Sequence, residues 1–379
     1  MTRRYRHSFE EDHDDVMVYR PESFEFPPAR GRRELEVDPD GSIREFRIGR
    51  GDAPEAVAGT RLEVAVLDQD VLEVRTGPHG CRGAHPAARL AVIERLDVAA
   101  ARRDPAIEAL LAELSGDEYR ALLTEITTPR SRHSLGAGFR AAVATAAGRL
   151  DALGYTVARA PIAVGTGTST NLIADRAGTG PVGDRGVVLV TAHLDSVNHE
   201  DGLDGAAPGA DDNASGSAGV LEMGRVLSGR TWRNDLRLIL FGGEEQGLFG
   251  SREYVAGLDA AERSRIRAVV NMDMIARRNT PSAGVLLEGA SVSQALIDAL
   301  ATAAATYTGL TVTSSLNPFA SDHVPFIEAG VPAVLTIEAD DSANTDVHSA
   351  RDTLATLDAD LALEILRMNV AAIAGELDR

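Results

Sequence analysis

Apolar positions change their spacing along the chain, and these changes predict where strands and helices lie. Beyond residue 113, continuous apolar runs alternate with segments in which apolar residues recur at helical spacing and end at glycine. Strands are expected at 155–157, 171–173, 186–190, 236–241, 268–270 and 333–337, and helices at 136–153, 215–228, 291–306 and 359–376. This alternation is typical of an α/β fold, with a mostly parallel central sheet flanked by helices.

The N-terminal third has a different pattern. Residues 34–76 alternate apolar and polar positions between Gly- and Pro-containing turns, which predicts short strands, and residues 84–126 turn helical. Residues 1–33 are polar with several prolines and are expected to form an arm with little structure. The predicted organisation is therefore an arm at 1–33, a small accessory β-rich and helical module at 34–112, and a main domain at 113–379.

Composition excludes several classes of function. The 379 residues carry 38 basic and 57 acidic side chains, a net charge of −19, so neither nucleic acid nor an anionic membrane is expected as a partner. The chain has no lysine, which excludes a Schiff-base lysine, a phosphate-loop lysine and a Ser–Lys dyad. Cys81 is the single cysteine, so neither an intrachain disulfide nor a cysteine-rich zinc site can form.

The termini and hydropathy carry an expectation about location. Residues 1–26 are charged and lack the apolar stretch of a signal peptide, and no apolar run approaches the length of a membrane span. A cytoplasmic protein is therefore expected.

Candidate chemistry is concentrated in five short motifs between residues 193 and 348. They contribute two imidazoles and four carboxylates, most of them at the ends of predicted strands: His193 in T-A-H-L-D, Asp212 in P-G-A-D-D-N-A-S-G, Glu244 and Glu245 in F-G-G-E-E-Q-G, Asp273 in N-M-D-M, and His348 in D-V-H-S. The carboxyl ends of parallel strands meet at one edge of a sheet. Two imidazoles and four carboxylates at that edge make a site for two divalent cations with a spare carboxylate, which is suited to metal-assisted hydrolysis of an amide.

Neighbouring residues fit supporting roles. Asp195, two residues after His193, is placed to accept the second N–H of this imidazole, and Asp352, four residues after His348, is a candidate for a similar role. Asp212 and Asn213 open a helix, so they could cap it, bridge two cations, or divide these tasks with Asn213 as the cap. Of the adjacent Glu244 and Glu245, one could bind a cation while the other faces the attacking water.

The other histidines have weaker signals. His323, in S-D-H, opens another predicted helix and is expected to support the fold. The six remaining histidines are interpreted as ordinary surface or loop residues: His7, His13, His79, His85, His133 and His199. The acidic loop at 201–205 does not match the spacing of a calcium-binding EF-hand.

The order of these motifs resembles the M28 family of zinc peptidases, which includes bacterial aminopeptidases and glutaminyl cyclases. The resemblance covers about 113–379 and runs through H-x-D, P-G-A-D-D-N-A-S-G, G-G-E-E-x-G, N-x-D-M, S-D-H-x-x-F and H-S-x-x-D-T. It implies a zinc peptidase catalytic domain at 113–379. Because no motif residue is missing, a non-catalytic binding protein on the same fold is the weaker alternative.

The resemblance also implies roles for the motif residues. His193, Asp212 and Asp273 would hold one zinc, and Asp212, Glu245 and His348 the other. Glu244 would be the general base and acid, with Asp195 and Asp352 orienting the ligands. Family members often have a cis peptide after the bridging aspartate, here Asp212–Asn213. Some place a tyrosine before the last histidine, where this chain has Val347, so the group that stabilises the oxyanion is not identified.

The sequence therefore predicts a metal-dependent hydrolase that removes N-terminal residues from peptides with a water activated by two zinc ions and Glu244. Manganese or cobalt are possible substitutes in a carboxylate-rich site. Three alternatives stay open: an amidohydrolase for a specialised metabolite or modified peptide, a glutaminyl cyclase-like acyltransferase with one zinc, and the binding protein. The partner is a peptide or small amide, and the N-terminal module is a possible site of homo-oligomerisation.

Overall fold

A computed structural model describes residues 3–9, 16–21, 31–37, 43–49, 55–56, 63–68, 71–75, 91–202, 205–318 and 321–379, with side chains from residue 93 onward. The chain forms two compact units. The smaller comprises residues 1–95 with 315–317, and the larger comprises residues 96–314 with 318–379.

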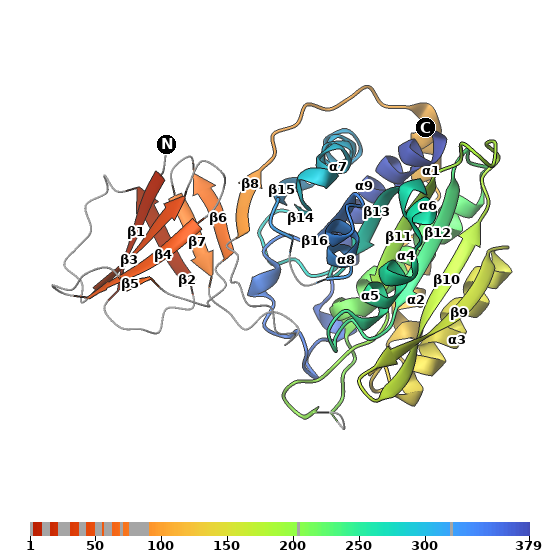
Figure 1. The fold of residues 1–379 in the computed structure, drawn as a ribbon, viewed down its shortest axis with the longest axis horizontal. Coiled ribbons are helices and arrows are strands. Elements are labelled where there is room, and N and C mark those ends of the chain that lie inside the picture. Colours follow the sequence, from red (N-terminus) through yellow and green to blue (C-terminus); the bar gives the residue numbers. More distant parts are fainter. Residues whose placement is uncertain are drawn as a thin grey trace. The chain divides into compact units, whose positions relative to one another are not determined.

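The described part of the smaller unit consists of strands (Figure 1): β1 (Arg3–Phe9), β2 (Val16–Pro21), β3 (Gly31–Val37), β4 (Ile43–Gly49), β5 (Glu55–Ala56), β6 (Glu63–Asp68), β7 (Val71–Arg75) and β8 (Ala91–Arg95). Strand β1 pairs antiparallel with β3 along its whole length, and β3 pairs with β4. Strands therefore occur within residues 1–33, where an arm was expected, because backbone pairing does not require the apolar alternation on which that expectation was based.

The larger unit is built on a mixed sheet, with the strand order β15-β14-β16-β13-β11-β12-β10-β9. The bounds are β9 (Thr156–Val164), β10 (Gly167–Arg176), β11 (Val187–His193), β12 (Asp235–Phe241), β13 (Ile266–Met272), β14 (Gly284–Glu288), β15 (Thr311–Ser315) and β16 (Ala333–Glu338). The central strands β12, β11, β13 and β16 are mutually parallel, whereas β9, β10 and β14 pair antiparallel. The prediction of a mostly parallel sheet therefore holds for the four central strands.

Helices cover both faces of this sheet (Figure 1): α1 (Pro105–Leu111), α2 (Gly116–Ile126), α3 (Ala137–Ala152), α4 (Gly216–Ser228), α5 (Phe249–Gly257), α6 (Ala260–Arg265), α7 (Gln294–Tyr307), α8 (His323–Glu328) and α9 (Ala359–Asp378). Alternate residues of β11 enter two different cores. Val188 and Val190 pack in the core shared with α4 and α9, and Leu189 packs with Phe241 and Phe326 on the other face. Burial of the central strands on both faces explains why their sequences are continuous apolar runs.

The boundary between units differs from the predicted domain boundary at residue 113. Helix α1 buries Leu110 and Leu111, and α2 buries Tyr119, in the same core as the central strands. These side chains are buried only by packing in the core of the larger unit, so both helices belong to it. The larger unit begins at Leu96. The shorter strands β14 and β15 and the helices α5 and α6 were not predicted, because each is too short to show a clear period. Helix α8 begins at His323, where the S-D-H motif predicted a helix.

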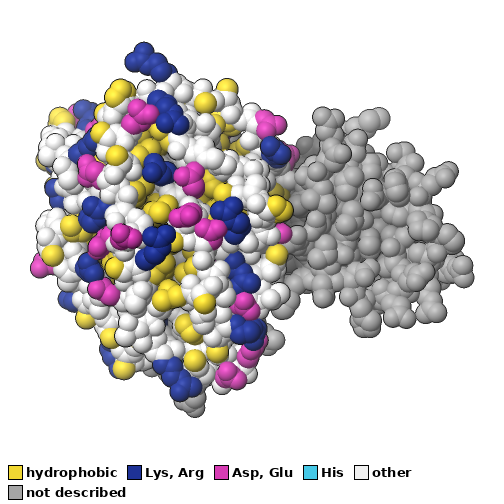
Figure 2. All heavy atoms as spheres, turned by 180° about the vertical axis from the view of Figure 1, so that it is seen from behind, with side chains coloured by type: hydrophobic (Ala, Val, Ile, Leu, Met, Phe, Trp, Pro, Cys, Tyr) yellow, Lys and Arg dark blue, Asp and Glu magenta, His cyan; other side chains and the backbone are white. Residues whose placement is uncertain are grey.

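On the face drawn in Figure 2, arginine and acidic side chains are interspersed over the described residues rather than gathered by sign. Among the described residues, no helix is both long enough and apolar enough to cross a bilayer.

The two-sided burial of the central strands predicts a stability effect. Leu189 is fully buried, so Leu189→Ala should lower the free energy of unfolding by about 2–5 kcal/mol, because it removes apolar contacts and leaves a cavity. Val182 is 77% exposed, and Val182→Ala should change it by less than about 0.5 kcal/mol. Urea unfolding with chelator present measures both, and equal effects would contradict this account of the core.

Candidate metal centre

The ends of parallel strands place the candidate side chains at one edge of the sheet. His193 is the last residue of β11, and Asp273 directly follows β13. Glu244 and Glu245 follow β12 after a tight turn in which Gly243 has φ of +71°. A side chain at Gly243 would bring its Cβ to 2.8 Å from Val164, so glycine is required for this close approach.

The loop before α4 brings Asp212 to the same edge. Asp212 lies in a kinked turn, Ala210–Ser215, where its own backbone is not helical, and the Asp212–Asn213 peptide is cis, as the sequence resemblance implied. The Asn213 side chain accepts a hydrogen bond from Gly216 N at 2.9 Å and donates one to Met272 O at 3.0 Å. Asn213 therefore caps the helix and ties it to β13, which leaves the carboxylate of Asp212 for the site.

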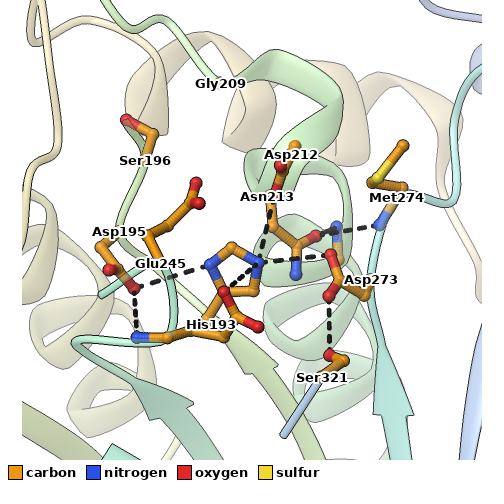
Figure 3. Close-up of polar contacts among 12 residues, drawn as sticks. His193, Asp195, Ser196, Gly209, Asp212, Asn213, Glu245, Asp273, Met274 and Ser321 are labelled. Carbon is orange, nitrogen blue, oxygen red and sulfur yellow. Dashed lines mark hydrogen bonds and ion pairs between the residues drawn. The ribbon is translucent and has the colours of Figure 1, made fainter. Parts of the chain in front are cut away.

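Two other candidate ligands lie beside His193 Nε2 (Figure 3). Asp212 Oδ1 and Asp273 Oδ1 each lie 3.2 Å from this nitrogen. All three side chains are buried, with exposed fractions of 1%, 6% and 7% for His193, Asp212 and Asp273. Their ligand atoms form one compact group that could hold a metal ion.

The second group shares Asp212. His348 Nε2 lies 2.9 Å from Asp212 Oδ2 and 2.9 Å from Glu245 Oε2. These atoms also lie within 4.8 Å of one another. His348 has φ of +56°, a left-handed conformation that is uncommon for a residue with a side chain and is often found at functional sites. One oxygen of Asp212 thus faces each group, as a bridging carboxylate requires.

The atoms in these groups fit divalent cations. Ligand atoms at zinc distances of about 2.0–2.2 Å from a tetrahedral centre lie about 3.4 Å apart. The separations of 3.2 Å around His193 Nε2 are close to that value. The buried Oε1 of Glu245 has no hydrogen-bond partner among the described residues, which is costly for a carboxylate unless a cation lies beside it.

Glu244 lies beside the first group without belonging to either. Its Oε2 is 4.0 Å from His193 Nε2, and its backbone N–H points to Asp195 Oδ1 at 3.4 Å. Burial raises the pKa of Glu244 well above its usual range, against the opposing charge of His193 and with a further contribution from Asp322. A carboxyl group with a raised pKa next to a cation site is suited to accept and return a proton.

Other carboxylates and a hydroxyl orient the candidate ligands. Asp195 Oδ1 lies 3.6 Å from His193 Nδ1, on the side of the ring away from Asp273 (Figure 3). Asp352 accepts the backbone N–H groups of Asp211 and Asp212 at 2.9 and 3.0 Å. Asp352 therefore fixes the loop that carries the bridging residue.

Ser321 orients Asp273 from another element. Its hydroxyl donates to Asp273 Oδ2 at 2.7 Å and accepts from Asn271 Nδ2 at 2.9 Å. The sequence placed Ser321 in a family motif without assigning it a role. Its neighbour His323 is buried, with Nε2 3.4 Å from Glu288 Oε1, and belongs to neither ligand group.

The structure adds a buried carboxyl pair behind Asp212. Asp211 accepts hydrogen bonds from Ala276 N and Asn344 Nδ2, each at 3.0 Å, and shares a hydrogen bond with Glu338, the last residue of β16. Burial, together with the charge of Asp352, raises the pKa of Asp211 to about 8. Burial and Asp211 likewise raise the pKa of Glu338 well above its usual range. No sequence pattern indicates this pair, because Glu338 ends an ordinary apolar strand.

His199 was interpreted as an ordinary loop residue, but it lies against a candidate ligand. Its ring centroid is 4.4 Å from that of His348, and its backbone N–H donates to His348 O at 2.8 Å. The two loops are also joined by Arg351, which binds both carboxylate oxygens of Glu200 at 2.8 Å. Only tertiary structure brings these loops together, since they lie about 150 residues apart.

Comparisons with known proteins identify the family to which the chain is similar. The family model described as Peptidase family M28 matches residues 171–373. Leupeptin-inactivating enzyme 1 of Streptomyces exfoliatus is 36% identical over 201 residues, covering 52% of this chain and 42% of that protein. The chain thus covers less than half the length of this curated relative.

Solved structures show the same fold. LapA of Legionella pneumophila superposes with a TM-score of 0.64 and 23% identity, covering 74% of this chain and 79% of that one. A structure described as BSAP, a zinc aminopeptidase from Bacillus subtilis, gives a TM-score of 0.61 and 18% identity, covering 70% of this chain and 96% of that one.

The electrostatics of the metal-free site predict proton release on metal binding. Burial opposes charge on both imidazoles, but Asp273 and Glu244 raise the pKa of His193 well above its usual value, and Glu245 and Asp212 raise that of His348 to about 12. Both imidazoles are therefore in the charged form at pH 7, and a cation that binds must displace one proton from each ring. Zinc affinity should rise with pH, by about tenfold per unit for each proton released.

Calorimetric titration with zinc in two buffers of different ionisation enthalpy counts these protons. His348→Ala should release fewer protons than the unaltered chain. Zinc affinity that is independent of pH between 6.5 and 8 would contradict this description of the site.

Proposed function

The chain belongs to Peptidase family M28, and we propose that it is a metal-dependent aminopeptidase that hydrolyses the amide bond after an N-terminal residue. The observation that carries the proposal is the pair of ligand groups that meet at Asp212 with Glu244 beside them. The names of relatives and structural neighbours, several of them aminopeptidases, support the choice of substrate class.

The residues divide between holding cations and moving a proton. His193, Asp212 and Asp273 would hold one zinc ion, and Asp212, Glu245 and His348 the other. When bound, the pair of cations supplies Lewis acidity that polarises the amide carbonyl and makes a water molecule more acidic. The chain contributes the fixed distances between ligands and the buried setting that strengthens these electrostatic effects.

Glu244 would carry the proton. It takes a proton from the attacking water and returns it to the leaving nitrogen, which requires a carboxylate that is near the cations and not bound to them. The 4.0 Å separation from His193 Nε2 and the absence of Glu244 from both ligand groups support this role. Asp195 holds both partners, because it accepts the N–H of Glu244 and lies beside the His193 ring.

The substrate is proposed to have a free α-amine. The site holds more carboxylates than two divalent cations need as ligands. The remaining negative charge favours a substrate with a free ammonium group over one with an acyl-blocked terminus. Manganese or cobalt would suit the same ligands. A glutaminyl cyclase-like reaction with one cation is disfavoured by the completeness of both groups.

The smaller unit is proposed to be an accessory module. Both ligand groups lie within the larger unit, so the smaller unit supplies none of these ligands. Residues 96–379 thus carry the proposed catalytic machinery.

Adjacent glutamates provide a matched pair of variants. Glu244→Gln should keep two zinc equivalents and lose at least about 100-fold in turnover, because the amide cannot accept the proton. Glu245→Gln should instead bind fewer zinc equivalents, because it weakens one ligand group. Elemental analysis and turnover on the same samples measure both. Near-normal turnover in Glu244→Gln would show that another residue is the base.

The substrate class has a separate test. Free aminoacyl-arylamides should release arylamine, chelator should abolish this release, and added zinc should restore it. The same compounds with an acetylated amine should react at least about tenfold more slowly, because the ammonium group is missing. Faster cleavage of the blocked compounds would favour a specialised amidohydrolase, and a stoichiometry of one zinc would favour a cyclase-like enzyme.

A further inference from the structure

A fully buried arginine lies between the two chain segments that carry the ligands. Arg132 is 0% exposed, and no sequence motif singled it out. Its Nε donates to Leu194 O at 2.8 Å, its Nη2 donates to Gly209 O at 2.8 Å, and its Nη1 donates to Pro208 O. The described hydrogen bonds of the guanidinium thus all end on backbone carbonyl oxygens.

These carbonyls belong to the segments that position two candidate ligands. Leu194 directly follows His193, and Gly209 lies three residues before Asp212. The fit at Gly209 is close, because a Cβ there would lie 3.1 Å from Arg132 Nη2 and 2.3 Å from Asp212 O. One rigid fork therefore fixes the exit of β11 against the entry of the bridging loop.

The charge of Arg132 also faces the site. Burial lowers the pKa of Arg132 to about 10, although Asp352 and Asp195 raise it, so the side chain stays charged at neutral pH. These are the two carboxylates that hold the Asp212 loop and the His193 ring. The guanidinium is thus set among groups that orient the ligands.

From these contacts we propose that Arg132 is a positioning residue for both cations, joining the His193 segment to the Asp212 segment through their backbone carbonyls. This inference rests on the proposed two-cation site and adds a residue outside the ligand groups. Without the fork, the two segments keep their separate ligands but lose the fixed distance between them. Zinc should then bind more weakly even though every ligand is still present.

The backbone of Arg132 is held independently of its side chain. Its N–H donates to Ser196 Oγ at 3.1 Å, and its carbonyl accepts from Ser196 N at 3.3 Å. Ser196 Oγ in turn donates to Ala207 O at 2.8 Å. Changing the side chain leaves these bonds intact, so variants at this position should still fold.

Two variants separate positioning from charge. Arg132→Lys keeps the positive charge but cannot bridge three carbonyls, and Arg132→Met removes both features. If Arg132 acts only through charge, removing it should tighten the binding of a cation. If Arg132 acts by positioning, both variants should weaken zinc binding by about 10–100-fold, the usual effect of losing a group that orients metal ligands.

The control is Arg237→Met. Arg237 is partly buried and binds both oxygens of Asp175, at 2.6 and 2.8 Å, but it lies near the start of β12, away from the strand ends that carry the ligands. Its loss should lower stability without changing zinc affinity. A residue that only stabilises the fold lowers the stability of metal-free and zinc-bound protein equally and leaves zinc affinity unchanged.

The experiment is titration of the full chain with zinc against a chromophoric chelator, together with urea unfolding of the metal-free and zinc-loaded forms. The proposal expects weaker zinc binding in Arg132→Lys and Arg132→Met, and normal binding in Arg237→Met. Unchanged or tighter binding in folded Arg132→Met would overturn it. Failure of both Arg132 variants to fold would also overturn it, because the role would then be structural.

The unaltered chain separates this proposal from the proposed function. If it binds no zinc, the two-cation function fails. If it binds two equivalents and the Arg132 variants bind equally well, only the positioning role fails.

Discussion

The concentration of buried negative charge at one edge of the sheet is the constraint on which the site depends. Asp212, Glu244, Glu245 and Asp273 are all at most 7% exposed, and Asp212 serves two ligand groups. Carboxylates this close and this far from water repel one another and lose hydration, which is unfavourable unless cations lie between them. Two divalent cations resolve this conflict, and in the metal-free site protons on the histidines do so in part.

Sheet topology brings the carboxylates to one edge, and contacts between loops then fix their positions. Parallel strands β11, β12 and β13 end at one edge, and this shared edge brings His193, Glu244 and Asp273 close together. The loops need further fixing, because they have no sheet to hold them. Asp352 binds the backbone of the Asp212 loop, and Arg132 ties that loop to the end of β11.

Sequence alone predicted what depends on local pattern. Apolar runs located β11, β12 and β13, and candidate ligands at the ends of these strands lie in the two groups around His193 and His348. It did not predict contacts made across the sequence. Arg132, His199 and Glu338 reach the site through tertiary packing, and a lone arginine, loop histidine or strand-end glutamate has no distinguishing spacing. The antiparallel edges of the sheet were also not predicted, because the direction in which two strands pair depends on how they are connected and not on their apolar runs.

The most direct test of the central claim is anomalous diffraction at the zinc absorption edge from crystals of the full chain grown with zinc. The account predicts two anomalous peaks, about 3.5–4 Å apart, with one oxygen of Asp212 bound to each and Glu244 bound to neither. A single peak, or two peaks that do not share Asp212, would contradict it.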